Sequence, residues 1–170
     1  MITAVTLGIA LAFEPAEEGT MRRRPRQRQQ GLLGAGLLWH IVLVASWFLV
    51  SVFGVFEYAI LQGYPEDLAR TIAMNTLVTL EIFHLLFIRN MNTKSLSWKG
   101  IRGTRALWAS IATVAVGQAA ITYVPLLQGV FKTQAVYFWD VVLIVGLGMF
   151  LFIVIEAEKQ FRLRVLDKPF

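Results

Sequence analysis

The sequence predicts an all-α membrane protein, with four transmembrane helices preceded by an N-terminal half helix. The first observation is composition: 56% of the 170 residues are hydrophobic and only 16% are charged, whereas about 25% are charged in soluble domains. The second is that apolar runs long enough to cross a bilayer as helices are separated by short polar connections. The third is that these runs are continuous rather than alternating, which argues against the strands of a membrane barrel.

The first apolar segment covers residues 1–13 and reads MITAVTLGIALAF. A helix of this length spans about 20 Å, against about 30 Å of membrane hydrocarbon. We therefore expect the latter half of a spanning helix whose first half is absent, ended by Glu14 and Pro15. An apolar helix lying in the membrane interface is the alternative.

Four full spans are predicted over residues 32–56, 71–88, 106–124 and 136–155. Each run has about the length that a helix needs to cross the bilayer. Residues 57–70 contain Gly63 and Pro65 and are expected to form a short connection, and residues 125–135 are expected to turn the chain. Together with the first segment, these spans place residues 1–170 in a single membrane domain.

Lysine and arginine are distributed unevenly among the connections. Three regions hold 14 of the 16 basic residues: positions 22–28, positions 89–105 and the tail after residue 155. Only Arg70 and Lys132 fall on the other side if every span crosses once, so the positive-inside rule places the basic loops and the C-terminus in the cytoplasm. The arginine-rich loop is expected to contact anionic membrane lipid. Basic and aromatic residues do not interleave, so no nucleic acid is expected as a partner.

The third span carries a glutamate in the stretch TLVTLEIFHL. A charge near the middle of a membrane helix costs about 2.5–3.5 kcal/mol, and Glu81 lies ten residues from Thr71 and seven from Ile88. His84 shares its helix face, because residues three apart are neighbours on a helix. Glu81 is interpreted either as an oxygen ligand for a cation or as a proton carrier. A protonated glutamate hydrogen-bonded to another helix is the structural alternative.

Other polar residues in or beside the spans are given structural interpretations. His40 and Gln118 are expected to make hydrogen bonds between helices. Asp140 sits among interfacial aromatic residues and is expected to reach water, with a structural role. Glu156 and Glu158 begin the charged tail and are expected to be solvated.

Catalytic motifs are absent from the sequence. It contains no cysteine, no glycine-rich phosphate loop, no zinc-protease histidine spacing and no serine in a nucleophile-elbow context. The chain is therefore expected to hold no catalytic residue and no cofactor site of its own.

The order of half helix, Glu-Pro exit, basic loop and four helices resembles the carboxy-terminal membrane region of P-type cation-transporting ATPases, a class that includes calcium pumps and their bacterial relatives. MITAVTLGIALAFEP resembles the latter half of the sixth transmembrane helix, and ARTIAMNTLVTLEIFHLLFIRN resembles the eighth. YVPLLQGVFKTQAVYFWD resembles the connection into the tenth helix. The resemblance implies an integral protein of the bacterial inner membrane.

The resemblance also implies a partial ion site. Thr3 falls on a threonine that holds the ion in calcium pumps, and Glu81 falls on the glutamate of that site. Ala4 replaces an aspartate, which suggests a monovalent ion or a proton rather than calcium. The family's phosphorylated aspartate and nucleotide domain are missing, so the chain is expected to need the N-terminal pump portion as its partner. Two other functions remain open: a stand-alone proton or cation carrier, and a structural assembly partner.

Overall fold

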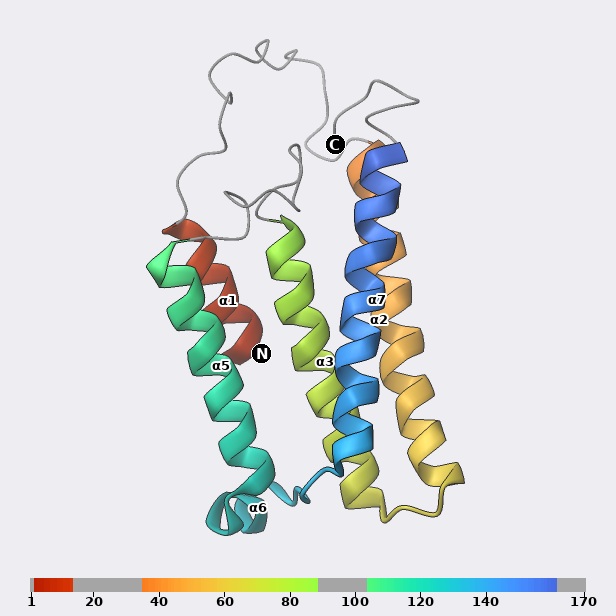
Figure 1. Ribbon diagram of the computed structural model, residues 1–170, viewed down its shortest axis with the longest axis vertical. Coiled ribbons are helices and arrows are strands. Elements are labelled where there is room, and N and C mark those ends of the chain that lie inside the picture. The colour runs from red at the N-terminus through yellow and green to blue at the C-terminus, as the bar shows by residue number, and fades with distance from the viewer. Residues whose placement is uncertain (1, 14–34, 89–103, 162–170) are drawn as a thin grey trace.

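The computed structural model describes residues 2–13, 35–88 and 104–161. Its elements are the helices α1 (Ile2–Ala12), α2 (Ala35–Leu61), α3 (Glu66–Ile88), α5 (Arg105–Tyr123), α6 (Pro125–Phe131) and α7 (Phe138–Phe161) (Figure 1). No strand occurs in these ranges. The basic regions at 22–28 and 89–103 and most of the charged tail lie outside the described residues.

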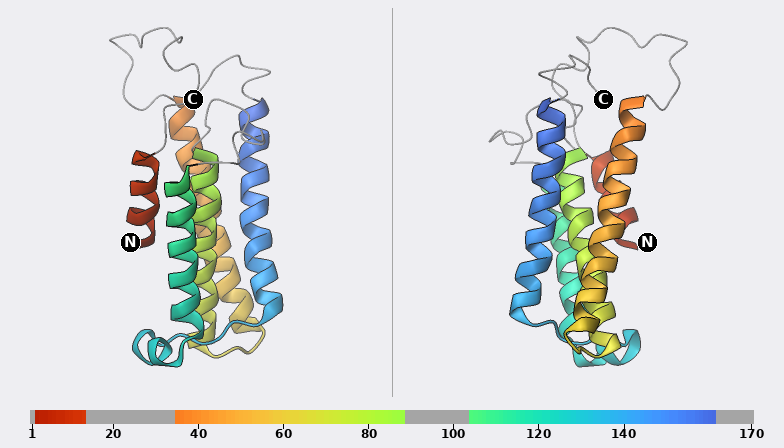
Figure 2. Two further views of the ribbon diagram at one scale, coloured as in Figure 1. Left: turned by 60° about the vertical axis from the view of Figure 1, so that its left-hand side comes forward. Right: turned by 90° about the vertical axis from the view of Figure 1, so that its right-hand side faces the viewer.

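Four of these helices, α2, α3, α5 and α7, are long and apolar enough to cross a membrane. The short helix α1 precedes them and has 11 residues. The predicted fold class, four spans after a short N-terminal helix, is therefore confirmed for the described part of the chain. Figure 2 shows α1 running beside only part of α5.

Both α2 and α3 extend further than the apolar runs suggested. α2 continues to Leu61 and α3 begins at Glu66, so only residues 62–65 connect them. The turn uses Gly63 at φ 77°, a conformation that glycine adopts without strain. Glu66 and Asp67 in the first turn of α3 suit the positive end of the helix dipole. Polar residues at both ends therefore belong to helices, which hydropathy alone does not indicate.

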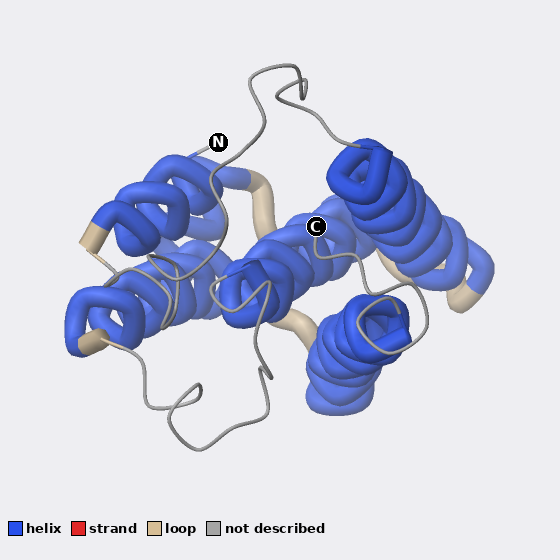
Figure 3. The backbone as a smooth tube through the Cα atoms, turned by 90° about the horizontal axis from the view of Figure 1, so that it is seen from above, coloured by secondary structure: helices blue, strands red, loops and turns tan. Residues whose placement is uncertain are grey.

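α3 is the centre of the bundle. α2 and α7 pack on one side of it, and α1 and α5 pack on the other (Figure 3). One apolar cluster joins α1, α3 and α5 through Leu7, Val78, Leu85, Leu107 and Val114. Another joins α2, α3 and α7 through Val44, Leu80, Phe87, Leu151 and Ile155. Among the described residues, neither α1 nor α5 contacts α2 or α7.

Polar contacts fix the end of the bundle where α3 begins. Asn75 Nδ2 of α3 donates to Thr122 Oγ1 of α5 over 3.2 Å. The backbone N–H of Gln134, between α6 and α7, donates to Thr71 Oγ1 over 3.1 Å. Thr133 Oγ1 also donates to the carbonyl of Ile121 over 2.6 Å. These contacts hold the α5–α6–α7 connection against α3.

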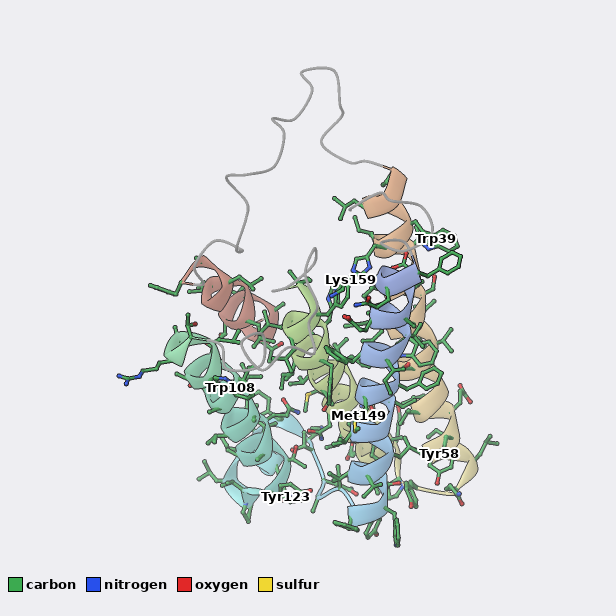
Figure 4. The ribbon with its side chains drawn as sticks, turned by 45° about the horizontal axis from the view of Figure 1, so that its top comes forward. Trp39, Tyr58, Trp108, Tyr123, Met149 and Lys159 are labelled. Atoms are coloured by element: carbon green, nitrogen blue, oxygen red, sulfur yellow. The ribbon has the colours of Figure 1, made fainter. Side chains whose placement is uncertain are left out.

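Large apolar side chains cover the outside of the helices, as expected for a surface that faces lipid. Figure 4 shows Trp39 near one end of the bundle, Tyr58 and Tyr123 near the other, and Trp108 between these levels, in the first turn of α5. All four are exposed. Tryptophan and tyrosine gather at the two membrane–water interfaces, so the placement of Trp39, Tyr58 and Tyr123 fits a bundle that crosses the bilayer.

Candidate functional site within the membrane helices

Glu81 lies on the side of α3 between the face that packs against α2 and the face that packs against α1. Leu77 and His84 line a groove shared with α2, whereas Val78 and Leu85 pack in the cluster that includes Leu7 of α1. Helical residues are about 100° apart around the axis, so Glu81 falls between these two faces. It is therefore placed on the side of α3 that lies between α1 and α2.

The Glu81 carboxyl group has an unmet bonding requirement. The side chain is half-buried, and Oε2 is buried with no hydrogen-bond partner among the residues that the structure describes. The predicted alternative, a hydrogen bond from Glu81 to another helix, is not found within these ranges. A buried polar oxygen without a partner costs about 1–3 kcal/mol, and more if it is charged. The site thus holds an acceptor that a proton or a cation can satisfy.

Thr3 lies on α1 and is half-buried. It comes one helical turn before Leu7, which packs in the same cluster as Val78 and Leu85 of α3. Within residues 2–13 and 35–88, no hydrogen bond joins Thr3 to Glu81. The next residue, Ala4, is exposed. The structure brings the two helices together without joining the two predicted site side chains directly.

Within the described residues, Gln118 does not make the expected hydrogen bond between helices. Its Nε2 atom is buried and has no partner in the described part of the chain. The α3–α5 hydrogen bond is made instead by Asn75 and Thr122, one turn further along α5. Both are small polar residues inside apolar spans, and that pattern was the available signal for this pair.

Asp140 was expected to reach water, and this is wrong because the residue is buried. The residue is only 3% exposed, in the first turn of α7. Tyr64, from the turn between α2 and α3, lies close to its carboxyl group. Partial burial, with the nearby Asp140 carboxylate as a further cause, raises the pKa of the Tyr64 phenol above its usual value. The structural role predicted for Asp140 fits this contact.

Glu156 and Glu158 were predicted to be solvated, and this is wrong. α7 continues past both residues to Phe161, so they lie on a packed helix. Glu156 is buried and forms an ion pair of 2.8 Å with Lys159, whose side chain is fully buried. The Lys159 ammonium lies 5.1 Å from the centre of the Phe87 ring on α3. Figure 4 shows Lys159 near the end of α7 that lies beside α3.

The two histidines of the chain meet across α2 and α3. His40 Nε2 lies 3.5 Å from His84 Nε2, and the Phe87 ring stacks on His40. The predicted contact of His40 with another helix is therefore present, although its partner was not foreseen. Both histidines line a groove of about 640 Å³ whose other lining residues are mainly apolar.

No group of three or more histidine, aspartate or glutamate side chains in the described ranges is placed to hold a metal ion. Glu81 is therefore not part of a ready multi-carboxylate centre within these residues. Any ion bound there would need further oxygen ligands, because hard cations take several.

Comparison with known proteins gives a consistent family. The family model for the C-terminus of cation-transporting ATPases matches residues 1–161. A probable cation-transporting ATPase F of Mycobacterium tuberculosis (strain ATCC 25618 / H37Rv) is 36% identical over 137 residues, covering 80% of this chain and 15% of the relative. The cation-transporting ATPase pma1 of Synechocystis is 30% identical, covering 78% of this chain and 15% of the relative. The calcium-transporting ATPase type 2C member 2 of mouse is 28% identical, covering 88% and 16%.

The chain thus spans about one-sixth of the length of these relatives or slightly less. The match runs through all four helices that can cross a membrane, so the protein is an integral membrane protein with several spans. On this evidence, the chain belongs to the family of cation-transporting ATPase C-terminal domains.

Proposed function

We propose that this chain acts as the C-terminal membrane part of an ATP-driven cation pump, in which Glu81 and Thr3 supply part of the ion pathway. The observation that carries the proposal is the buried Glu81 Oε2, which has no hydrogen-bond partner among the described residues. A carboxylate in a membrane span is costly unless a proton, a cation or water compensates it. Phosphorylation and ATP hydrolysis are assigned to parts of the pump beyond this chain.

Thr3 supports the same proposal from the neighbouring helix. Its hydroxyl is a neutral oxygen ligand on α1, which packs against α3. Ala4 contributes no oxygen from its side chain, so Glu81 is the single carboxylate of this pair of helices near the site. One negative charge suits a monovalent cation or a proton better than a divalent ion, because fewer charges must be balanced.

The proposed partner is the N-terminal portion of a pump, which completes the ion site with its own membrane helices. The described residues form no complete metal centre, and that is why the site is proposed as shared. We further propose residence in a bacterial inner membrane, with the basic loops and the C-terminus cytoplasmic and the arginine-rich loop touching anionic lipid. The uneven distribution of lysine and arginine supports this orientation.

The test is a chimera in which this chain replaces the matching C-terminal region of the Mycobacterium tuberculosis relative. ATP hydrolysis in membrane vesicles is measured against calcium, sodium and proton concentration. For the cation that stimulates hydrolysis, Glu81→Gln is expected to raise the half-saturating concentration at least about tenfold, a loss of about 1.4 kcal/mol.

Glu57→Gln is the matched control, because Glu57 is an exposed carboxylate on α2. It is expected to leave the half-saturating concentration unchanged. Equal cation dependence in the two variants would contradict the ligand assignment for Glu81. A folded chimera without any cation-stimulated hydrolysis would contradict the proposed place of the chain in a pump. The stand-alone carrier and the assembly partner are not favoured, because the family match is to a pump domain.

A further inference from the structure

A short helix, α6, lies at the end of the bundle where α3 begins. It follows α5 after a single residue, Val124, and runs across the long axis of the bundle rather than along it (Figure 1, Figure 2). Leu126 is 76% exposed and Val130 is 69% exposed. Residues four positions apart are neighbours on a helix surface, so these two side chains form one apolar outer face of α6.

The polar groups of α6 and of the residues around it are bonded inside the protein. Gln128, about half a turn away from the outer face, donates from Nε2 to the carbonyl of Thr122 over 2.6 Å. Just after the helix, Thr133 donates from its backbone N–H to the carbonyl of Gln128 and from Oγ1 to the carbonyl of Ile121. Pro125 at the start of α6 has no N–H to satisfy. These bonds fasten α6 to the end of α5 and leave its outer face to apolar side chains.

The length of α5 sets the level of α6 in the membrane. α5 has 19 residues, which gives about 28 Å of helix against about 30 Å of membrane hydrocarbon. Arg105 at its start keeps its charge out of the hydrocarbon, so Tyr123 at its other end reaches the opposite edge. Because α6 begins directly after Val124, it lies at the boundary between the hydrocarbon and the lipid headgroups.

The surroundings of α6 have the composition of a membrane–water interface. Tyr123 is exposed at the end of α5, and Tyr137 and Trp139 are exposed around the start of α7. Tyrosine and tryptophan gather at this level of a bilayer. Lys132 is the only charged residue between positions 124 and 139 and is exposed just after α6, where a lysine can extend its ammonium group towards lipid phosphates. The lipid-facing surface of the spans therefore continues onto α6.

We propose that α6 is an interfacial anchor that binds the surface of the phospholipid bilayer. Leu126 and Val130 lie among the lipid chains just below the headgroups, and Lys132 lies at the level of the phosphates. Since Gln128 and Thr133 fasten α6 to α5, the anchor fixes the depth of α5 in the membrane. This inference rests on the helices that can cross the membrane and does not depend on the proposed pump function.

A protein surface is the competing occupant of the outer face. The chain spans 15% of the length of two of the relatives named above, and a further part of a pump would be large enough to cover α6. The level of α6 favours lipid, because a face at the edge of the hydrocarbon meets lipid unless protein shields it. The experiment therefore has to separate lipid, water and protein.

The chain contains no cysteine, so a cysteine introduced at position 126 or 130 places one nitroxide label on the outer face. In phospholipid nanodiscs, collision of the label with oxygen, which enters lipid, is compared with collision with a water-soluble nickel chelate. Val116→Cys, exposed near the middle of α5, is the hydrocarbon reference, and Gln62→Cys, exposed in the α2–α3 turn, is the water reference. We expect Leu126→Cys and Val130→Cys to report depths between the two references, about 5–10 Å into the boundary of headgroups and acyl chains.

Circular dichroism is used to check that the four labelled variants keep the same helix content. Nickel-chelate collision at positions 126 and 130 as frequent as at position 62 would overturn the proposal, because α6 would then lie in water. Shielding from both reagents would also overturn it, because a second copy of the chain would then cover the face. The measurement is repeated in the pump chimera with its other cysteines replaced. Labels that meet lipid in the chain alone but are shielded from both reagents in the chimera would show a pump segment on α6 and would equally overturn the proposal.

Discussion

Gly148 of α7 lies directly against Phe83 of α3, with no room for a side chain at position 148. A Cβ atom there would overlap the Phe83 ring and lie 3.1 Å from Thr79 Cγ2. The absence of a side chain lets the two helices approach each other closely, as small residues do between membrane helices.

Gly148→Val is expected to destabilise the bundle by about 1–3 kcal/mol, the usual cost of overpacking a filled interface. Gly146→Val is the matched control, because a Cβ at Gly146 meets no atom within 4 Å. Both variants place the same residue in α7, so the difference reports packing rather than helix propensity. Thermal unfolding in detergent measures it; equal midpoints would show that Phe83 moves aside without cost.

Removing one member of the buried Glu156–Lys159 pair is expected to cost about 3–5 kcal/mol, because the remaining charge stays buried without its partner. Lys159→Met tests this, and Glu156→Gln combined with Lys159→Met is expected to recover part of the loss. Arg70→Met breaks the exposed pair with Glu66 and should cost less than about 1 kcal/mol. Denaturant unfolding compares the variants. A loss for Lys159→Met no larger than that for Arg70→Met would contradict the buried pair.

Thr122→Val removes a hydroxyl that bonds with Asn75 of α3. The expected loss is about 0.6 kcal/mol, the average found for hydrogen bonds between membrane helices, and at most about 1.7 kcal/mol. Thr113→Val on the same helix is the control, since its exposed hydroxyl donates only to the carbonyl of Ala109 within α5. Unfolding in the same detergent gives both values. An equal effect of the two substitutions would show that the α3–α5 bond adds no stability.

Tyr64 gives the bundle a dependence on alkaline pH. The pKa of its phenol is raised in the folded protein by partial burial and by Asp140, so the folded state holds this proton more tightly than the unfolded state. The stability from this difference is complete below about pH 10, the ordinary tyrosine value, and is lost as pH rises through the folded pKa. Tyr64→Phe should therefore show a shallower fall in unfolding temperature between about pH 9 and pH 11. Tyr123→Phe is the control and should keep the wild-type slope, because Tyr123 is not among the groups that raise the pKa of Tyr64; identical slopes for both variants would contradict the effect.

The long spans could be predicted because a continuous apolar run has few stable alternatives in a bilayer. Contacts between distant segments could not. Asp140 is buried and lies near Tyr64, which is far earlier in the chain. Glu156 is buried in an ion pair with Lys159, whose ammonium lies over the Phe87 ring of α3. His40 was expected to touch another helix, but hydropathy does not indicate which residue it meets. Glu81 was identified by its cost in the membrane, and its role as an ion ligand stays a prediction.

In the described part of the chain, α3 is the helix that contacts both halves of the bundle, α1 with α5 and α2 with α7, and this has a mechanical consequence. The α1–α5 half is fastened by Asn75, Thr122 and Thr71 at the end where α3 begins. Towards the opposite end, apolar side chains such as Leu85 and Leu107 hold it to α3, and such contacts slide more easily than hydrogen bonds break. We therefore expect α1 and α5 to pivot, as a unit, about the hydrogen-bonded end relative to α2 and α7. A change in the angle between the two halves would then change the surroundings of Glu81, which lies between α1 and α2.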